Sequence, residues 1–361
     1  MISIKVNATK PYEVIIGSGV ISELGTVIKR TCPKAEKVLF VSDSNVAPLH
    51  LGEVIAILRE GYGELETEEY IFEAGEQNKN LSTIDNIFDK LASFGMTRTD
   101  VIVSLGGGVT TDMAGFAAAT YMRGIPVIHL PTSLLAQVDA SVGGKTGVDH
   151  RSGKNIIGAF YQPQAVIIDV DFVKTLPSKV FTEGMAEVIK YAFIMDKPLY
   201  ELLNKTDRAE LQGDSKLLIE VIGKCAEDKV TVINEDEFDN GRRQLLNFGH
   251  TMGHIIERDS NFTVTHGDAV SIGMGIIAKA SCEQGLCSKE TCEALINLLI
   301  KYGLPIDFKF NAAHLARSAM HDKKARGSMV SVIVLKDIGE AVINKMSSNE
   351  IYEFIRDVLQ A

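Results

Sequence analysis

The sequence lacks the features that mark several large protein classes. None of its apolar runs approaches the roughly 18–20 residues with which a helix crosses a bilayer. The first ten residues, MISIKVNATK, alternate like a β-strand and have neither the apolar core nor the cleavage site of a secretory signal. The five cysteines are odd in number and include no Cys-x-x-Cys pair, which argues against a disulfide framework and against cysteine-bound zinc. We therefore expect a reduced, cytoplasmic protein.

The sequence also has fewer basic than acidic residues. The 361 residues include 37 Lys and Arg against 47 Asp and Glu, for a net charge of −10. Nucleic acids and anionic membranes attract proteins with a basic field, so this balance argues against both as partners. A small anionic substrate needs only a local basic pocket, and the composition permits one. The length suggests two domains, each large enough to bury a core.

The order of apolar patterns predicts two domains of different class. Strand-like runs at 37–41, 101–105, 127–130 and 166–169 alternate with helical spacing, which predicts a largely parallel sheet with helices on both faces. After about residue 176 helical periodicity dominates, and 330–335 is the main candidate for a strand. We predict an α/β, Rossmann-like domain over residues 1–176 and a mainly α-helical domain over residues 177–361.

Two glycine-rich segments of the first half could bind an anion. Gly106 to Gly108 follow a buried strand and precede a helix, where backbone N–H groups can hold a phosphate. The same spacing suits a tight turn with close helix–strand packing, and it is not the G-x-G-x-x-G fingerprint, so both interpretations stay open. The segment 139–155 carries Lys145 and Lys154 among glycines, which suits anion capture, although a flexible surface loop would have a similar composition.

Three of the eight histidines cluster in the second half. His250 and His254 stand four residues apart, on one face of an expected helix, and His266 follows after a short interval. Imidazole nitrogens at this spacing suit zinc, and Glu187 on another expected helix could add a carboxylate. From spacing alone we favour His250 and His254 as the ligand pair; the alternative is that these histidines cap helices or pack against them.

Several longer stretches resemble the 3-dehydroquinate synthase family, in the same order along the chain. They are residues 104–112, 121–124, 130–147, 153–155, 184–190, 247–254 and 266–268. The resemblance implies the dehydroquinate synthase-like fold and an NAD- and metal-dependent lyase of the shikimate pathway, with zinc or cobalt as the metal. Such an enzyme converts 3-deoxy-D-arabino-heptulosonate 7-phosphate to 3-dehydroquinate and phosphate. The steps are transient oxidation at C5, phosphate elimination, re-reduction, ring opening and an intramolecular aldol closure.

The resemblance also implies a role for individual residues. It makes the metal ligands Glu187, His250 and His266, and it turns His254 into a neighbouring proton-relay or hydrogen-bonding group. The implied catalytic residues are Lys145, Lys190, Arg243 and His254. The implied substrate binders are Arg123, Lys145, Asn155, Lys190, Lys229, Arg243, Asn247 and Lys324, with Lys323 as an equal alternative to Lys324. The implied NAD contacts are Asp43, Asn45, Glu76, Lys79, Gly107, Gly108, Val109, Asp112, Thr132, Ser133, Asp139, Lys145, Lys154 and Thr175.

The resemblance extends to assembly, and it is not complete. Arg123 matches an arginine that reaches the phosphate from the other subunit, which implies a homodimer. The chain departs from the family pattern at three places: Lys179 and Val180 replace an Arg-Glu pair, Asp239 replaces a glutamate, and Asp268 replaces the glutamate of His-Gly-Glu.

Three other functions stay open at this point. One is a related sugar-phosphate cyclase that makes an inosose, a valiolone or an amino-quinate. The second is an iron-type or glycerol-type alcohol dehydrogenase, and the third is a binding protein without activity. The full set of cationic side chains favours a substrate with a carboxylate, and the presence of every implied ligand argues against an inactive protein.

Overall fold

The computed structural model describes residues 1–260, 263–308 and 329–360. It divides the chain into two compact units, one of Met1–Pro177 with Gln212–Phe238 and one of Ser178–Leu211 with Asp239–Ala361. The first crossing lies beside the expected boundary at residue 176. The chain then returns to the first unit for residues 212–238, which we had placed in the helical domain. It does so because α8 (Ser215–Glu235) packs against β1 (Ile2–Val6) and β2 (Tyr12–Gly17).

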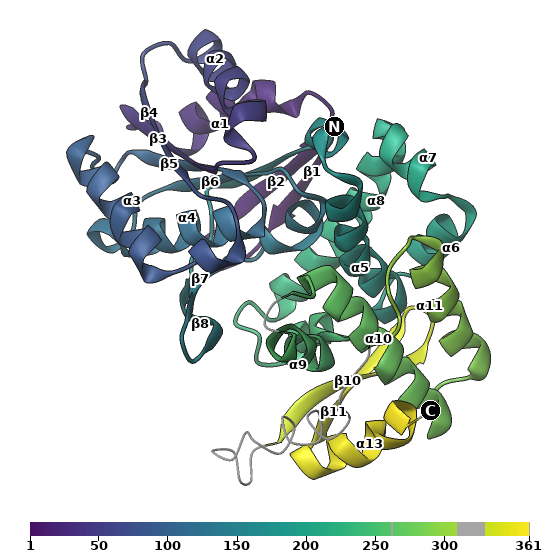
Figure 1. The fold of residues 1–361 in the computed structure, drawn as a ribbon. Coiled ribbons are helices and arrows are strands. Elements are labelled where there is room, and N and C mark those ends of the chain that lie inside the picture. Colours follow the sequence, from purple (N-terminus) through teal and green to yellow (C-terminus); the bar gives the residue numbers. More distant parts are fainter. Residues whose placement is uncertain (261–262, 309–328, 361) are drawn as a thin grey trace. The chain divides into compact units, whose positions relative to one another are not determined.

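The first unit is built on a seven-stranded sheet (Figure 1). The pair β1–β2 is antiparallel and every other neighbouring pair is parallel. The predicted parallel sheet is therefore confirmed. The spatial order is β1, β2, β9 (Ala165–Asp169), β6 (Val127–Pro131), β5 (Val101–Gly106), β3 (Lys37–Asp43) and β4 (Glu66–Phe72).

Helices cover both faces of this sheet. Figure 1 shows α1 (Leu24–Thr31) and α2 (Gly52–Gly61) on one face, and α3 (Leu81–Ser93) and α4 (Gly108–Thr120) on the other. Because successive side chains of a strand point to opposite faces, alternate residues of β3 enter the two resulting apolar cores. This burial on both sides explains why the central strands are continuous apolar runs.

A β-hairpin occupies part of the segment that we expected to be a glycine-dense loop. β7 (Lys145–His150) and β8 (Gly153–Phe160) pair antiparallel as a separate two-stranded sheet. Gly147 and Gly158 face each other across the pair, and a Cβ on Gly158 would lie 2.1 Å from the carbonyl oxygen of Thr146. The glycines thus permit close strand pairing. Their number had favoured a loop, but here it reflects two strands whose backbones approach closely.

The second unit is mainly helical, as predicted. Its long α10 (His266–Glu283) is buried along most of its length and packs against α5 (Ser178–Ile194), α9 (His250–Asp259) and α11 (Lys289–Lys301). The hairpin of β10 (Val330–Asp337) and β11 (Glu340–Met346) contains the strand expected near residues 330–335. The described residues of this unit also form α6 (Lys197–Lys205), α7 (Arg208–Gly213), whose last two residues belong to the first unit, and α13 (Ser348–Gln360).

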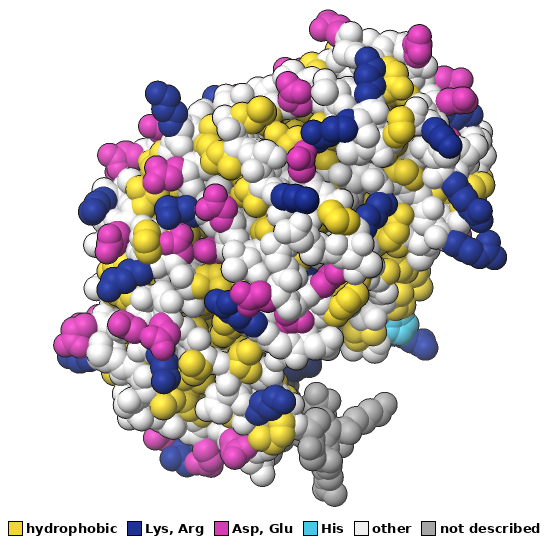
Figure 2. Space-filling model, turned by 180° about the vertical axis from the view of Figure 1, so that it is seen from behind, with side chains coloured by type: hydrophobic (Ala, Val, Ile, Leu, Met, Phe, Trp, Pro, Cys, Tyr) yellow, Lys and Arg dark blue, Asp and Glu magenta, His cyan; other side chains and the backbone are white. Residues whose placement is uncertain are grey.

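The surface mixes charges of both signs. Figure 2 shows acidic and basic side chains interspersed, with hydrophobic ones between them, on the face that it presents. Within the part of the chain that the structure describes, no helix combines the length and apolar character that a membrane crossing requires.

Candidate functional site

Three side chains of the second unit converge on one point. Glu187 comes from α5, His250 from the start of α9 and His266 from the start of α10, and one ligand atom of each lies within 4.8 Å of the others. The Nε2 atoms of His250 and His266 lie 3.5 and 3.3 Å from Oε1 of Glu187. Two imidazole nitrogens and a carboxylate oxygen are a donor set that zinc and cobalt accept, with positions left for a substrate oxygen. These residues therefore fit a divalent metal ion.

Hydrogen bonds on the outer sides of both rings orient them toward that point. Nδ1 of His250 lies 3.2 Å from the carbonyl oxygen of Phe248, so Nδ1 carries the proton and Nε2 keeps its lone pair. Nδ1 of His266 lies 3.5 Å from Oε1 of Glu257, which is almost fully buried. A carboxylate behind a ligating histidine fixes the tautomer and the ring plane. Glu257 is not among the residues predicted from the sequence, although it stands seven residues after His250, on the same face of α9.

The local charges favour a cation at this point. Burial lowers the pKa of His250 to about 3, so this imidazole is neutral. Burial would also lower the pKa of His266, but hydrogen bonds and charge interactions with Glu187 and Glu257 outweigh it and raise the pKa to about 9. The two buried carboxylates thus stabilise positive charge next to the ring nitrogens.

Glycines let the three helices approach closely enough for the ligands to meet. A Cβ on Gly273 of α10 would lie 2.1 Å from the carbonyl oxygen of Gly249, directly before α9. A Cβ on Gly267 of α10 would lie 2.3 Å from the carbonyl oxygen of Glu183 in α5. Gly249 also has a φ of 79°, a left-handed conformation that glycine adopts without steric cost. The small residues that surround the histidines in the sequence therefore set the spacing of the helices.

Four other predicted residues of the second unit fall within the part of the chain that the structure describes. Lys190 is fully buried and forms an ion pair with Glu187, one turn away on α5. His254 is exposed, and its ring centroid lies 5.6 Å from that of His250, but it is not a member of the three-residue group. Spacing alone had favoured His254 as a ligand; the structure brings His266 to that position instead. Arg243, which is buried, and Asn247 lie on the short helix η7 (Arg242–Asn247) that precedes α9.

Two departures from the family pattern lie opposite each other. Lys179 at the start of α5 has its Nζ 4.0 Å from Oδ2 of Asp268 in the first turn of α10. Lys179 is largely exposed, so this pair contributes little to stability.

The glycine turn of the first unit lies where β5 gives way to α4. Gly107 is the N-cap of α4 and offers no side chain to cap its first N–H groups. A Cβ on Gly107 would lie 3.3 Å from Oγ of Ser133, and one on Gly108 would lie 3.2 Å from Cβ of Ala140. The turn is therefore tightly packed and also presents an uncapped helix N-terminus, so the two interpretations of its sequence are compatible.

Asp43 joins the loop after β3 to this turn. Its Oδ1 accepts hydrogen bonds from the backbone N–H groups of Asn45 and Val46, and its Oδ2 accepts one from the Thr110 hydroxyl of α4 at 3.1 Å. The N–H of Thr132 donates to the carbonyl oxygen of Gly106 at 3.0 Å. The carboxyl ends of β3, β5 and β6, where ligands of parallel α/β sheets bind, are thus tied together.

Further predicted residues of the first unit are held by one another. Lys229 of α8 forms an ion pair with Asp139, so the helix that returns to this unit carries a predicted substrate binder to a predicted NAD contact.

Two predicted lysines and Thr175 also have partners in the first unit. Lys79 binds both Asp112 and Asn155, and Lys154 binds Glu76 at 3.1 Å. The hydroxyl of Thr175 accepts a hydrogen bond from Nε2 of His50 at 2.8 Å and donates one to Phe172.

Three more residues were predicted for the site. Lys145 is exposed at the start of β7. Arg123 is exposed on the short helix η4 (Tyr121–Arg123) and has a φ of 67°. Lys324, like its alternative Lys323, lies outside the described residues.

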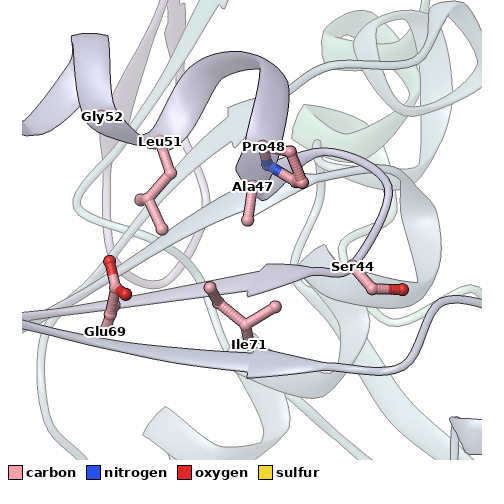
Figure 3. A pocket seen from close by; sticks show the side chains of 7 residues that line it. All are labelled: Ser44, Ala47, Pro48, Leu51, Gly52, Glu69 and Ile71. Carbon is pink, nitrogen blue, oxygen red and sulfur yellow. The ribbon is translucent and has the colours of Figure 1, made fainter.

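A cavity of about 360 Å³ lies beside α2 and is distinct from these clusters (Figure 3). It contains none of the predicted site residues, although Ser44 stands between Asp43 and Asn45 in the sequence. It is lined by Ser44, Ala47, Pro48, Leu51, Gly52, Glu69 and Ile71.

Comparisons with known proteins identify relatives over nearly the whole chain. Sequence profiles described as 3-dehydroquinate synthase N-terminal and C-terminal match residues 69–183 and 184–325. The 3-dehydroquinate synthase of Lactococcus lactis subsp. cremoris (strain MG1363) is 42% identical over 348 residues, which cover 96% of this chain and 97% of that protein.

Two solved structures of cyclases are similar in fold. A 2-deoxy-scyllo-inosose synthase complexed with carbaglucose-6-phosphate, NAD+ and Co2+ matches with a TM-score of 0.86 at 27% identity, over 99% of this chain and 100% of that one. A 2-epi-5-epi-valiolone synthase from Streptomyces hygroscopicus with NAD+ and Zn2+ bound matches with a TM-score of 0.85 at 25% identity, over 97% of both chains.

The ligand assignment predicts the metal content of three variants. Glu187→Gln and His250→Ala remove one donor each, so we expect purified, dialysed protein to fall from about one divalent ion per chain to a trace, with its circular dichroism unchanged. His254→Ala is the matched control and should keep its metal. A Glu187→Gln or His250→Ala protein that retained a full complement of metal would contradict the assignment.

The helix spacing predicts a difference between two Gly→Ala variants of α10. Gly273→Ala meets backbone at 2.1 Å, so it should lower the stability of the protein by about 1–3 kcal/mol and weaken Co²⁺ binding. Gly275→Ala meets its nearest atom at 3.4 Å and should be neutral or stabilising. Thermal unfolding and Co²⁺ titration of both proteins check this. Equal effects would show that the approach of α9 to α10 does not set the metal site.

Proposed function

The chain belongs to the 3-dehydroquinate synthase family, and we propose that it converts 3-deoxy-D-arabino-heptulosonate 7-phosphate to 3-dehydroquinate and phosphate. The observation that carries this proposal in the structure is the group of Glu187, His250 and His266 with the buried Lys190 beside it. A metal-binding donor set next to a buried cation suits a substrate with an oxygen to be polarised and an anion to be held.

We assign the metal, zinc or cobalt, to Glu187, His250 and His266, and NAD to the first unit. NAD bound there would supply the hydride acceptor and donor for C5, and a metal ion held by the three ligands would supply a Lewis acid for the C5 oxygen. Lys190 forms a buried ion pair with Glu187, which places an ammonium ion beside the metal position, where it could hold an anionic group of the substrate. The exposed His254, next to His250, is positioned to exchange protons with substrate and solvent.

Residues at the carboxyl edge of the sheet make up the NAD site in this proposal. The loops after β3, β5 and β6 and the N-terminus of α4 provide backbone N–H groups, which suit a pyrophosphate. The assigned contacts are Asp43, Asn45, Glu76, Lys79, Gly107, Gly108, Val109, Asp112, Thr132, Ser133, Asp139, Lys145, Lys154 and Thr175.

A set of cations and amides accounts for a substrate that carries both a carboxylate and a phosphate. Ammonium and guanidinium groups are donors only, so they suit two anionic groups better than a neutral polyol. This composition favours the heptulosonate phosphate over hexose phosphates. The assigned substrate binders are Lys145, Asn155, Lys190, Lys229, Arg243, Asn247 and Lys324, with Arg123 from a second subunit.

Phosphate release under limiting NAD tests this function. With NAD below the enzyme concentration, we expect many turnovers of phosphate per NAD because the cofactor is regenerated in each cycle. A chelator should abolish the release, and Zn²⁺ or Co²⁺ should restore it. Absence of phosphate with NADH accumulating from a small polyol would instead identify a dehydrogenase. Faster turnover of a hexose or sedoheptulose phosphate would identify a different cyclase.

We also propose that the enzyme is a cytoplasmic homodimer in which Arg123 reaches the substrate phosphate of the other subunit. Arg123 is exposed, and both Met122 and Arg123 adopt left-handed conformations with φ of 49° and 67°. Each such residue costs about 1–3 kcal/mol, and a strained, exposed arginine supports a role beyond packing.

A mixing experiment checks the shared site. Arg123→Ala and Glu187→Gln should each be nearly inactive alone. After unfolding and co-refolding in equal amounts, half of the dimers carry one intact site, so about a quarter of the wild-type activity should return. Activity that stayed at the level of the separate variants would place Arg123 outside the partner's site.

A further inference from the structure

Lys79 of the first unit is a buried cation between two elements that carry predicted site residues. It lies directly after the short helix η3 (Glu76–Asn78) and is only 4% exposed. Its Nζ lies 2.6 Å from Oδ2 of Asp112 on α4 and 2.6 Å from Oδ1 of Asn155 on β8. Burial alone would lower the pKa of Lys79, but the charges of Asp112 and Glu76 outweigh burial and raise it, so Lys79 is an ammonium ion.

An ammonium ion determines which end of the Asn155 amide faces it. It has three donors and no acceptor, so only the amide oxygen of Asn155 can form this hydrogen bond. The Nδ2 group then points the other way, and its two N–H bonds are what the side chain can offer a ligand. The backbone of Asn155 is also fixed in position. It has a φ of 53°, and its N–H donates to Oδ1 of Asp149 at 2.8 Å.

Two further contacts join the tip of the β7–β8 hairpin to the segment 76–79. The N–H of Asp149 donates to the carbonyl oxygen of Lys79 at 2.8 Å, and Nζ of Lys154 lies 3.1 Å from Oε1 of Glu76. The backbone of the hairpin is thus anchored without the Lys79 side chain. Besides its assigned contact with NAD, the side chain sets the amide of Asn155 and the carboxylate of Asp112.

We infer that Lys79 is a positioning residue that fixes the Asn155 amide with its N–H groups toward an anionic group of the substrate. The inference rests on the assignment of Asn155 to the substrate in the proposed function. Without Lys79 no ammonium ion selects the amide oxygen of Asn155, and the neighbouring group is the Asp112 carboxyl, whose pKa is raised by burial. The amide would then be free to turn, and it would present its oxygen to the substrate anion.

A double-mutant cycle of Lys79→Met and Asn155→Ala tests the inference, with phosphate release measured at saturating NAD. Lys79→Met should raise the KM for the heptulosonate phosphate about tenfold or more, because a hydrogen bond to a charged group is replaced by repulsion. In the Asn155→Ala background the same substitution should change KM by less than about twofold, because there is no amide left to orient. Lys90→Met, at an exposed ion pair of the same unit, is the matched control and should leave KM unchanged.

The results distinguish a failure of the inference about Lys79 from a failure of the proposed function. Equal effects of Lys79→Met in both backgrounds would show that Lys79 changes KM independently of Asn155, through NAD, the substrate or stability alone, and would overturn the inference. A wild-type enzyme that released no phosphate would refute the proposed function instead.

A second variant applies if Lys79→Met does not fold. Asn155→Asp keeps a partner for Lys79 and should retain the melting temperature, but it removes both N–H donors and should raise KM at least as much. An Asn155→Asp enzyme with the wild-type KM would show that the oxygen of Asn155 faces the substrate, and would also overturn the inference.

Discussion

The need of the buried Glu187 carboxylate for cationic or hydrogen-bonding partners is the constraint on which the arrangement of the second unit depends. A charge without solvent costs several kcal/mol unless cationic or hydrogen-bonding groups surround it. Lys190 supplies one such group from the same helix, and His250 and His266 supply their ring nitrogens from two other helices. Three helices must therefore meet at this point. The glycines of α9 and α10 make that meeting possible, because a single methyl group at Gly273 would collide with backbone.

Buried groups in the first unit, a cation and a carboxylate, also gather partners around them. Lys79 is a buried cation, and Asp112 and Asn155 are arranged around it as acceptors. Asp43 is a buried carboxylate that collects donors from the loop after β3 and from α4. In each unit a buried charge connects segments far apart in sequence, and these segments carry the residues assigned to substrate, NAD or metal. Charge pairing thus sets the positions that the chemistry requires.

The outer contacts of the metal ligands show how a site is completed beyond its ligands. Glu257 stands behind His266 and the carbonyl of Phe248 stands behind His250, so each imidazole has one nitrogen engaged and the other directed inward. The pKa of His266, raised to about 9 by the two carboxylates, reflects the same field that would attract a divalent ion. The three side chains between which this field acts are the ones that could hold a metal ion, Glu187, His250 and His266.

The sequence by itself determined the fold class, the parallel strands, the helical second half and the family, because these depend on local periodicity and on motifs that are contiguous in the chain. It also placed Glu187, His250 and His266 together, but only through resemblance; spacing alone favoured His254, since i and i+4 residues share a helix face. The tertiary structure decided what depends on distant segments. It brought α8 with Lys229 back to the first unit, paired glycine-rich strands as a hairpin, set Glu257 behind His266, and joined Lys79 to Asn155. These contacts link residues far apart in the chain, 90 positions in the case of Asp139 and Lys229, and no local pattern encodes such a pairing.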